Sequence, residues 1–353
     1  MFFSFKVFFI SKKFKYYRFS LLTLSLLISL IIINKNRTPL IRGSLATIKI
    51  ARKYFNKDLY EDELLGTDFF TKGRSFASII QSDNRYLIYY SSRNRFNNNI
   101  TINMREANNL RDLSIAKSRV LINKFDANVT AQVWMPYVFK ENNNYFMIFT
   151  ARSGDYMTDN YLEEIRIANS KDGINWEVNP KPILSPSLQW EGREVENWGI
   201  IKKGKTYYMS YESRGYTRRQ SDRAIGIAYS NNLRDWKRMK DEPFIFQSEY
   251  CSAFFSVEDY IYHLVPNNNR FRVYRFNNFG NFDKESFIGF WYPLGKENKY
   301  IYDSPDIITP DIRKKLNSNS PLKIIYSVYI NDEWVTKFIK YENPSKFFES
   351  LIP

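Results

Sequence analysis

Cysteine and histidine are almost absent from this chain of 353 residues. The single cysteine, Cys251, excludes an intramolecular disulfide framework and a metal site built from cysteines. The single histidine, His263, stands in an apolar, strand-like run, which favours a buried core position over a catalytic or metal-binding one. A Ser–His–Asp hydrolase therefore has almost nothing from which to build its triad. We predict neither a metal nor a cofactor.

Acidic residues are missing from the first 57 positions, which hold twelve Lys and Arg. The remainder has 40 basic and 37 acidic residues, so it carries only +3 of the net charge of +15. A nucleic-acid-binding domain needs a basic face on its folded part. We therefore expect no nucleic-acid partner, and we expect the basic front to meet anionic lipid headgroups.

Long hydrophobic runs are scarce too. Residues 19–33 are fifteen positions without a charge, shorter than the roughly twenty of a spanning helix but long enough for a signal-peptide core or a short signal anchor. The run is preceded by Lys12, Lys13, Lys15 and Arg18, and no small-x-small cleavage site follows it. We predict a membrane-anchor helix within residues 1–45, a linker over 46–65 and a single-pass membrane protein with an extracytoplasmic domain. Secretion after signal cleavage is the alternative.

Helical periodicity is nearly absent, and a strand-like unit recurs five times instead. Aromatic and β-branched runs recur about every sixty residues, at 86–90, 145–149, 207–211, 260–264 and 324–328. Each run follows an apolar pair, with a polar turn between them in the first four copies, which predicts β-hairpins. Polar turns ending in Leu or Trp keep the same period, at 108–113, 170–176 and 230–236. Repeats of this size predict an all-β fold, a five-bladed β-propeller over residues 66–353. Its inner strands should lie near 75–81, 134–140, 195–201, 250–256 and 303–309.

Two stretches of the chain carry a resemblance to known enzymes. They are residues 133–151, around Trp134-Met-Pro-Tyr, and residues 167–176, which are repeated as 227–236. Both resemble blade motifs of the five-bladed propeller glycosidases, namely the arabinanases and β-xylosidases of glycoside hydrolase family 43, the invertases and the mannoside phosphorylases. The resemblance implies a glycan-processing site in a central funnel, with carboxylates at the starts of inner strands.

The expected acids of that site are displaced in this chain. Counting back from each apolar pair, the family position of the acid is occupied by Phe76, Asn197 and Tyr250 in blades one, three and four. One position earlier, the five blades carry Ser75, Trp134, Glu196, Glu249 and Asp303. Glycosidic cleavage needs one acid that protonates the leaving oxygen and a second carboxylate that activates water or attacks the sugar. We assign Glu249 as the acid and Glu196 or Asp303 as the base or nucleophile, all facing a wet funnel.

Further residues are candidates for substrate binding. Tryptophan faces can stack on sugar rings, and indole N–H groups can donate hydrogen bonds, although core packing is the alternative for each. The candidates are Trp134, Trp190, Trp198, Arg193, Asn197 and Asp306. Two functions stay open: a membrane-anchored, glycoside hydrolase-like enzyme, or a catalytically silent propeller that binds glycans or serves in assembly.

Overall fold

The computed structural model describes most of the chain after residue 62, and every described residue belongs to one compact unit over residues 61–353. The described residues are 63–66, 77–82, 84–93, 99–110, 112–114, 116–215, 223–246, 252–277, 286–296, 301–308, 315–330 and 333–353. The predicted anchor lies outside them. Within them, no helix has the length and apolar character needed to cross a membrane.

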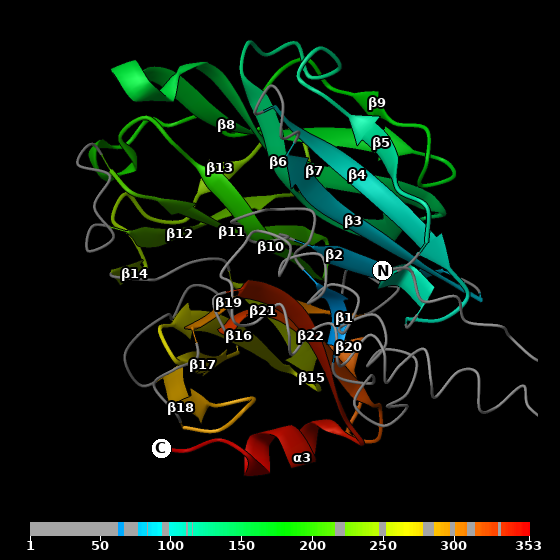
Figure 1. Ribbon diagram of the computed structural model, residues 1–353. Coiled ribbons are helices and arrows are strands. Elements are labelled where there is room, and N and C mark those ends of the chain that lie inside the picture. Colours follow the sequence, from blue (N-terminus) through cyan, green and yellow to red (C-terminus); the bar gives the residue numbers. More distant parts are fainter. Residues whose placement is uncertain are drawn as a thin grey trace, which may run out of the picture. The chain divides into compact units, whose positions relative to one another are not determined.

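The described strands form five sheets, which are the five blades of a propeller (Figure 1). The first blade contains β2 (Ser78–Ser82), β3 (Arg85–Arg93), β4 (Ile100–Ala107) and β5 (Arg119–Ile122). The second contains β6 (Gln132–Glu141), β7 (Asn144–Asp155), β8 (Asn160–Ser170) and β9 (Glu177–Val178). The third contains β10 (Glu196–Lys203), β11 (Thr206–Ser213), β12 (Ala224–Ser230), β13 (Lys237–Arg238) and β14 (Ile245–Phe246).

The last two blades are less regular. The fourth contains β15 (Ala253–Val257), β16 (Tyr260–Asn267), β17 (Arg270–Phe276) and β18 (Phe287–Trp291), and β20 (Lys315–Leu316) runs parallel to β15. The fifth contains β19 (Ile301–Ile307), β21 (Leu322–Ile330), β22 (Glu333–Tyr341) and, outermost, β1 (Glu63–Gly66). Among the described residues, helical turns are few: η2 (Asp112–Ser114), η3 (Tyr156–Thr158), η4 (Gln189–Glu191) and α3 (Pro344–Glu349).

The five inner strands close a ring. β2 contacts β6, β6 contacts β10, β10 contacts β15, β15 contacts β19, and β19 contacts β2. The hydrophobic clusters lie between successive blades; one joins Leu87 and Tyr89 of blade one to Met147 and Phe149 of blade two. These strands confirm the predicted all-β propeller and the places of its inner strands. Strand β1 pairs with β22 and so completes the last blade. It begins within residues 46–65, which we predicted to be a linker.

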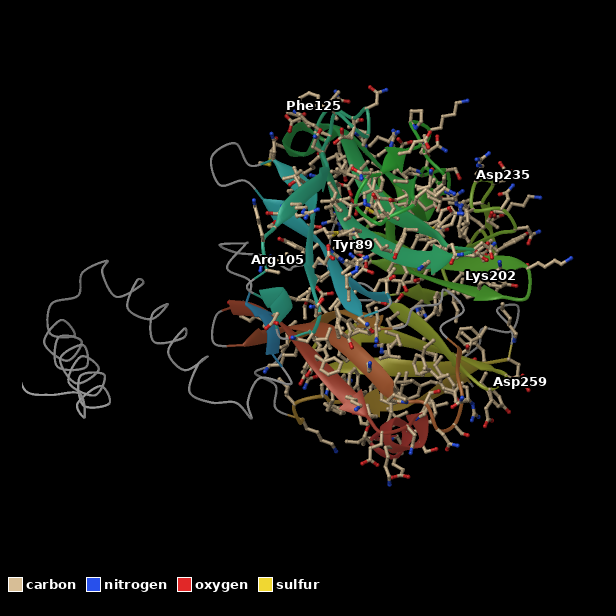
Figure 2. The ribbon with its side chains drawn as sticks, turned by 90° about the vertical axis from the view of Figure 1, so that its right-hand side faces the viewer. Tyr89, Arg105, Phe125, Lys202, Asp235 and Asp259 are labelled. Carbon is tan, nitrogen blue, oxygen red and sulfur yellow. The ribbon has the colours of Figure 1, made fainter. Side chains whose placement is uncertain are left out.

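The polar corners between outer strands are built alike in blades two and three. Ser170 Oγ accepts the backbone N–H of Gly173 at 2.9 Å, and Trp176 Nε1 donates to Gly173 O at 3.1 Å. In the next blade, Ser230 and Trp236 make the same two bonds to Leu233, at 3.0 Å each. The corners and the hairpin turns lie on one side of the molecule, where Figure 2 labels Lys202, Asp235 and Asp259.

His263 lies on β16 and is fully buried. Its ring stacks on Phe254 with centroids 4.2 Å apart, and burial lowers the pKa of the imidazole to about 3. The histidine is therefore neutral and part of the core, as the sequence predicted.

Candidate functional site

Three of the predicted ring positions share one level of the propeller. Trp134, Glu196 and Asp303 are paired across their hairpins with Thr150, Glu212 and Ser327. In each hairpin, the second residue of the apolar pair lies opposite a residue of the next strand: Phe146, Tyr208 or Lys323. Thr150, Glu212 and Ser327 each follow that residue by four positions, so the three pairs occupy equivalent places in their blades. The predicted positions in blades one and four, Ser75 and Glu249, lie outside the described residues.

The inner strands are irregular at this level. β6, β10 and β19 each contain a register shift, directly after Trp134, Asn197 and Asp303 respectively. Bulges of this kind bend a strand and re-aim its side chains, and they are frequent near active sites. Met135, within the first bulge, has a φ of 57°, and its N–H donates to Ser91 Oγ of blade one at 2.8 Å.

Buried acids gather beside Glu196. This set, called the acid cluster below, contains Glu163 of β8, Glu194, Glu196 of β10, Glu212 of β11 and Asp303 of β19, and each residue is at most 4% exposed. Their mutual effects on proton affinity place them close together: the charges of Glu196 and Asp303 both act on Glu212, and those of Glu194 and Glu196 act on Glu163.

Three arginines face the acid cluster. Arg152 pairs with Glu163, and Arg223 pairs with Glu212. Arg214 binds Glu194 through Nε at 2.5 Å and Nη2 at 3.1 Å, and its Nη2 lies 4.0 Å from Oε1 of Glu196. Because buried charges are costly unless they are balanced, an excess of carboxylates over guanidinium groups favours keeping protons on some of the acids.

Two acids of the cluster have raised pKa values. Burial raises the pKa of Glu212 to about 8; Arg223 opposes the increase, and the charges of Glu196 and Asp303 add to it. Burial, followed by the charge of Glu196, also raises the pKa of Glu163 well above its usual range, despite Arg152. At neutral pH the raised pKa values therefore favour a proton on Glu212 and on Glu163.

The expectation of a wet funnel is wrong for the described acids. Glu196 is 4% exposed and Asp303 is fully buried. For Glu196 the reason lies in its neighbours: Glu212 stands opposite it on the second strand of blade three, and Nη2 of Arg214 lies 4.0 Å from its Oε1. Asp306 is also buried, accepts a hydrogen bond from Ser78 Oγ of blade one at 3.2 Å and lies near Tyr137 of blade two, whose pKa its charge raises. It therefore ties three blades together near the axis.

The described tryptophans make contacts within the protein. Trp134 is 4% exposed, and the Arg152 guanidinium lies 4.7 Å above its ring. Trp190 stacks on Tyr211 with centroids 5.6 Å apart, and its Nε1 donates to Asp241 O at 2.8 Å. Both arrangements favour the core-packing alternative. Arg193 is exposed. Asn197 and Trp198 lie on β10, but their side chains are not among the described ones.

Sequence reasoning missed the acids of the second and third strands. Glu212 and Arg214 stand in the run Tyr211-Glu-Ser-Arg, directly after the aromatic strand that defined the repeat. Charged residues at the end of a strand that is otherwise apolar were the available signal. Among the described residues, no group of three or more His, Cys, Asp or Glu is arranged to hold a metal ion.

Part of the chain is similar in sequence to known enzymes. Residues 157–282 match the family of β-1,4-mannooligosaccharide phosphorylases. A 1,2-β-oligomannan phosphorylase of Thermoanaerobacter sp. (strain X514) is 41% identical over 86 residues, which are 24% of this chain and 29% of that protein. A β-1,2-mannobiose phosphorylase of the same organism is 32% identical over 108 residues, 30% of this chain and 35% of that protein. The matches thus span about a third of the length of these relatives.

Comparison with solved structures concerns the fold alone. A family 117 glycoside hydrolase of Zobellia galactanivorans superposes with a TM-score of 0.58 at 12% identity, over 82% of this chain and 97% of the other. The catalytic domain of a GH62 α-L-arabinofuranosidase of Coprinopsis cinerea superposes with a TM-score of 0.55 at 9% identity, over 79% and 94%. The resemblance to five-bladed propeller glycosidases and mannoside phosphorylases is confirmed. The match over residues 157–282 contains every member of the acid cluster except Asp303.

Proposed function

We propose that this propeller cleaves glycosidic bonds of β-linked mannooligosaccharides and transfers the mannosyl group to inorganic phosphate. The supporting observation is the acid cluster, which holds a proton near neutral pH beside the start of the third inner strand. Four of its five members lie within the residues that match the mannooligosaccharide phosphorylases. That match supports the choice of mannose as the sugar and of phosphate as the acceptor.

The chemistry needs few groups from the protein. A phosphate oxygen forms a bond to the anomeric carbon while the bond from that carbon to the leaving oxygen breaks, and the leaving oxygen takes a proton from a carboxylic acid. We propose Glu249 as this acid, with Glu196 and Asp303 as the carboxylates of the same funnel. With water in place of phosphate, the same groups would perform hydrolysis, and one of the two carboxylates would act as the base.

Burial of Glu196 and Asp303 sets a condition on this proposal. Both are closed off from solvent by neighbouring side chains, so an oligosaccharide reaches them only when those side chains rearrange. Substrate binding should therefore change the surroundings of Trp134, which lies at the same level as Glu196. Tryptophan fluorescence during titration with oligosaccharide would report such a change.

The experiment that tests the function is an assay of the purified chain with β-1,4- and β-1,2-mannooligosaccharides, with and without phosphate. Formation of mannose 1-phosphate is the expected result, and release of free mannose without phosphate would indicate hydrolysis. Glu196→Gln should lower the activity, whereas Glu242→Gln, which changes an exposed acid outside the cluster, should keep it. A wild-type chain that yields neither product would contradict the enzyme.

A catalytically silent glycan-binding propeller is the second candidate. Two observations favour it: Phe76 stands where the related families carry the acid of blade one, and the described ring acids are buried. This candidate predicts saturable binding of mannooligosaccharide without product in either assay. The same titrations therefore distinguish the two functions.

We also propose that residues 1–45 anchor the protein in a membrane, with the propeller on the extracytoplasmic side. The support is the uncharged run of residues 19–33 with basic residues before it. Deleting residues 1–45 should release a soluble, folded propeller from the membrane fraction. Full-length protein that fractionates without membranes would contradict the anchor.

A further inference from the structure

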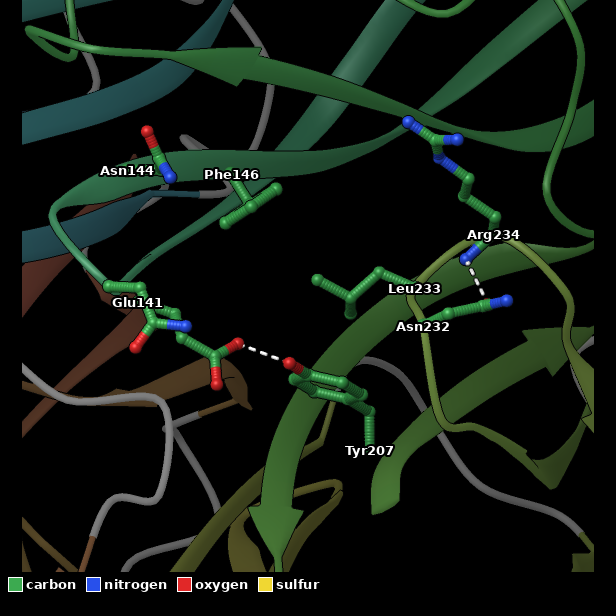
Figure 3. Close-up of a pocket in the computed structure, with 8 residues that line it drawn as sticks. Glu141, Asn144, Phe146, Tyr207, Asn232, Leu233 and Arg234 are labelled. Atoms are coloured by element: carbon green, nitrogen blue, oxygen red, sulfur yellow. Dashed lines mark hydrogen bonds between the residues drawn. The ribbon is translucent and has the colours of Figure 1, made fainter. Parts of the chain in front are cut away.

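Two adjoining pockets lie between blades two and three, at the end of the blades opposite the acid cluster. Their volumes are about 380 Å³ and 590 Å³. Both are lined by the same five residues, Asn144, Phe146, Asn232, Leu233 and Arg234, and we call the combined depression the interblade groove (Figure 3). Each volume falls in the range of roughly 300–1,000 Å³ that is usual for ligand sites. The groove is thus large enough for several sugar units.

The floor of the interblade groove is apolar and strained. Phe146 is half-buried, with one face stacked on Phe139 at a centroid distance of 5.5 Å. Leu233 faces it across the pocket (Figure 3) and has a φ of 65°. Bulky residues avoid this left-handed conformation. The chain thus holds a large apolar side chain at the floor of the groove at the cost of backbone strain.

The walls of the groove also carry groups that can form hydrogen bonds. Lys171 Nζ donates to Asn144 Oδ1 at 2.7 Å, and Asn169 Nδ2 donates to Glu177 Oε2 at 3.2 Å. Within the described part of the chain, these bonds leave the Nδ2 group of Asn144 and the Oδ1 atom of Asn169 for a ligand. Arg234 is exposed, and its guanidinium has no ion pair or hydrogen bond to any described residue. Amide and guanidinium groups of this kind match the donors and acceptors of sugar hydroxyls.

The charge of the groove indicates a neutral ligand. Glu141 at one end is already bonded to Lys202 and Tyr207 (Figure 3 shows the tyrosine bond). Of the remaining charged side chains, Lys171 and Arg234 are cations and Glu177 is an anion. A polyanion would need a stronger positive field, and an apolar ligand would leave the polar walls unpaired. A chain of neutral sugars satisfies both the apolar floor and the polar walls.

We propose that the interblade groove is a second glycan-binding site, separate from the funnel, which takes a neutral oligosaccharide. One sugar ring would place its C–H face on Phe146, while its hydroxyl groups pair with Asn144, Asn169 and Arg234. The chemical class of the ligand follows from the groove alone, whereas the choice of mannose for the probe rests on the proposed function.

Isothermal titration of the full chain with β-1,4-mannotetraose in phosphate-free buffer tests this site. Arg234→Ala and Asn144→Ala should each weaken one binding event at least about tenfold, because each removes a polar group that pairs with the ligand. Both should leave kcat/KM for β-1,4-mannobiose unchanged. Lys205→Ala, an exposed cation beside the hairpin turn of blade three and outside the groove, should bind like the wild type.

The possible results separate this site from the proposed function. Binding that weakens in Arg234→Ala, in a protein that forms no product, supports the groove and contradicts the enzyme. If both groove variants cleave normally and bind the tetraose like the wild type, the proposed groove site is wrong and the proposed enzymatic function stands. A wild-type chain without any binding at millimolar tetraose also overturns the groove.

Discussion

Blade three has two different ends: one carries the hairpin turn and the polar corner, and the other, the funnel end, carries acids of the acid cluster. At the end with the hairpin turns, the corner of residues 230–236 repeats the backbone hydrogen bonds of the corner of residues 170–176 in blade two. Asn232 Oδ1 accepts two backbone N–H groups, as Asp172 Oδ1 does in blade two. At its funnel end, Glu196 faces Glu212 across the hairpin, whereas blade two has Trp134 facing Thr150 at the same level. The repeated corners thus stabilise the fold, whereas the buried acids occur where the sequence of blade three differs from that of blade two.

One departure also occurs within the repeated corner. Blade two has Gly173 where blade three has Leu233, and both residues have a positive φ. A Cβ on Gly173 would lie 2.7 Å from the hydroxyl of Tyr89 in blade one. The residue of blade two that corresponds to Tyr89 is Ile148, which lies in the same core cluster as Leu233. Each interface thus combines one large and one small partner, so the interblade contact stays filled.

The largest effect is expected at the funnel end. Glu249→Gln should lower turnover at least about a hundredfold, the lower bound for a positioned general acid, and Glu196→Gln should also impair the rate. A substrate with an activated leaving group should rescue Glu249→Gln more than Glu196→Gln, because only the acid assists departure. Steady-state rates with aryl mannosides measure this difference. Wild-type turnover in Glu249→Gln would remove that residue from the mechanism.

A large effect on folding is expected from copying blade three into blade two. Gly173→Leu should destabilise the propeller by about 2–3 kcal/mol, since the new side chain overpacks against Tyr89 and adopts a strained φ. Adding Tyr89→Ile should recover part of the loss, in a double-mutant cycle followed by urea unfolding. Additive effects of the two substitutions would show that the corners do not depend on their partners.

At Leu233, glycine should be less destabilising than alanine, although the opposite order is common. Leu233→Gly and Leu233→Ala both lose the packing of leucine against blade two. Glycine, however, relieves the positive φ, which alanine retains at a cost of about 1 kcal/mol. The glycine variant should therefore be the more stable of the two in urea unfolding. An alanine variant as stable as the glycine variant would show that Leu233 is not strained.

The smallest effect concerns pH. Because the pKa of Glu212 is raised to about 8 in the folded protein, the native state keeps a proton that the unfolded chain releases near its ordinary pKa of about 4.3. Stability contributed by this group is complete below the unfolded pKa and is lost as the pH rises toward 8. The melting temperature of Glu212→Gln should fall less steeply over this window than that of the wild type, while Glu242→Gln should follow the wild type. Parallel curves for all three proteins would refute the raised pKa.

Repetition explains why the sequence predicted so much of the fold and so little of the site. Hairpins such as residues 145–149 and corners such as 170–176 are formed by neighbouring residues. Each copy therefore shows the same pattern of apolar strand residues and polar turn residues. The ring level of Trp134, Glu196 and Asp303 followed by counting within those hairpins, which is also a local operation. The burial of these acids could not be predicted in this way, because it depends on side chains from other strands, such as Glu212 and Arg214.

The sequence by itself determined the number of blades, the strand order within each hairpin and the neutral, core position of His263, since all depend on short-range patterns of apolar and polar residues. Only the tertiary structure decided which charges meet. It brought Glu163 of blade two, Glu212 of blade three and Asp303 of blade five together, and it closed the ring with β1 against β22. Residues so far apart in the chain become neighbours only after blades have packed, and electrostatic energy in a buried cluster depends on those final distances.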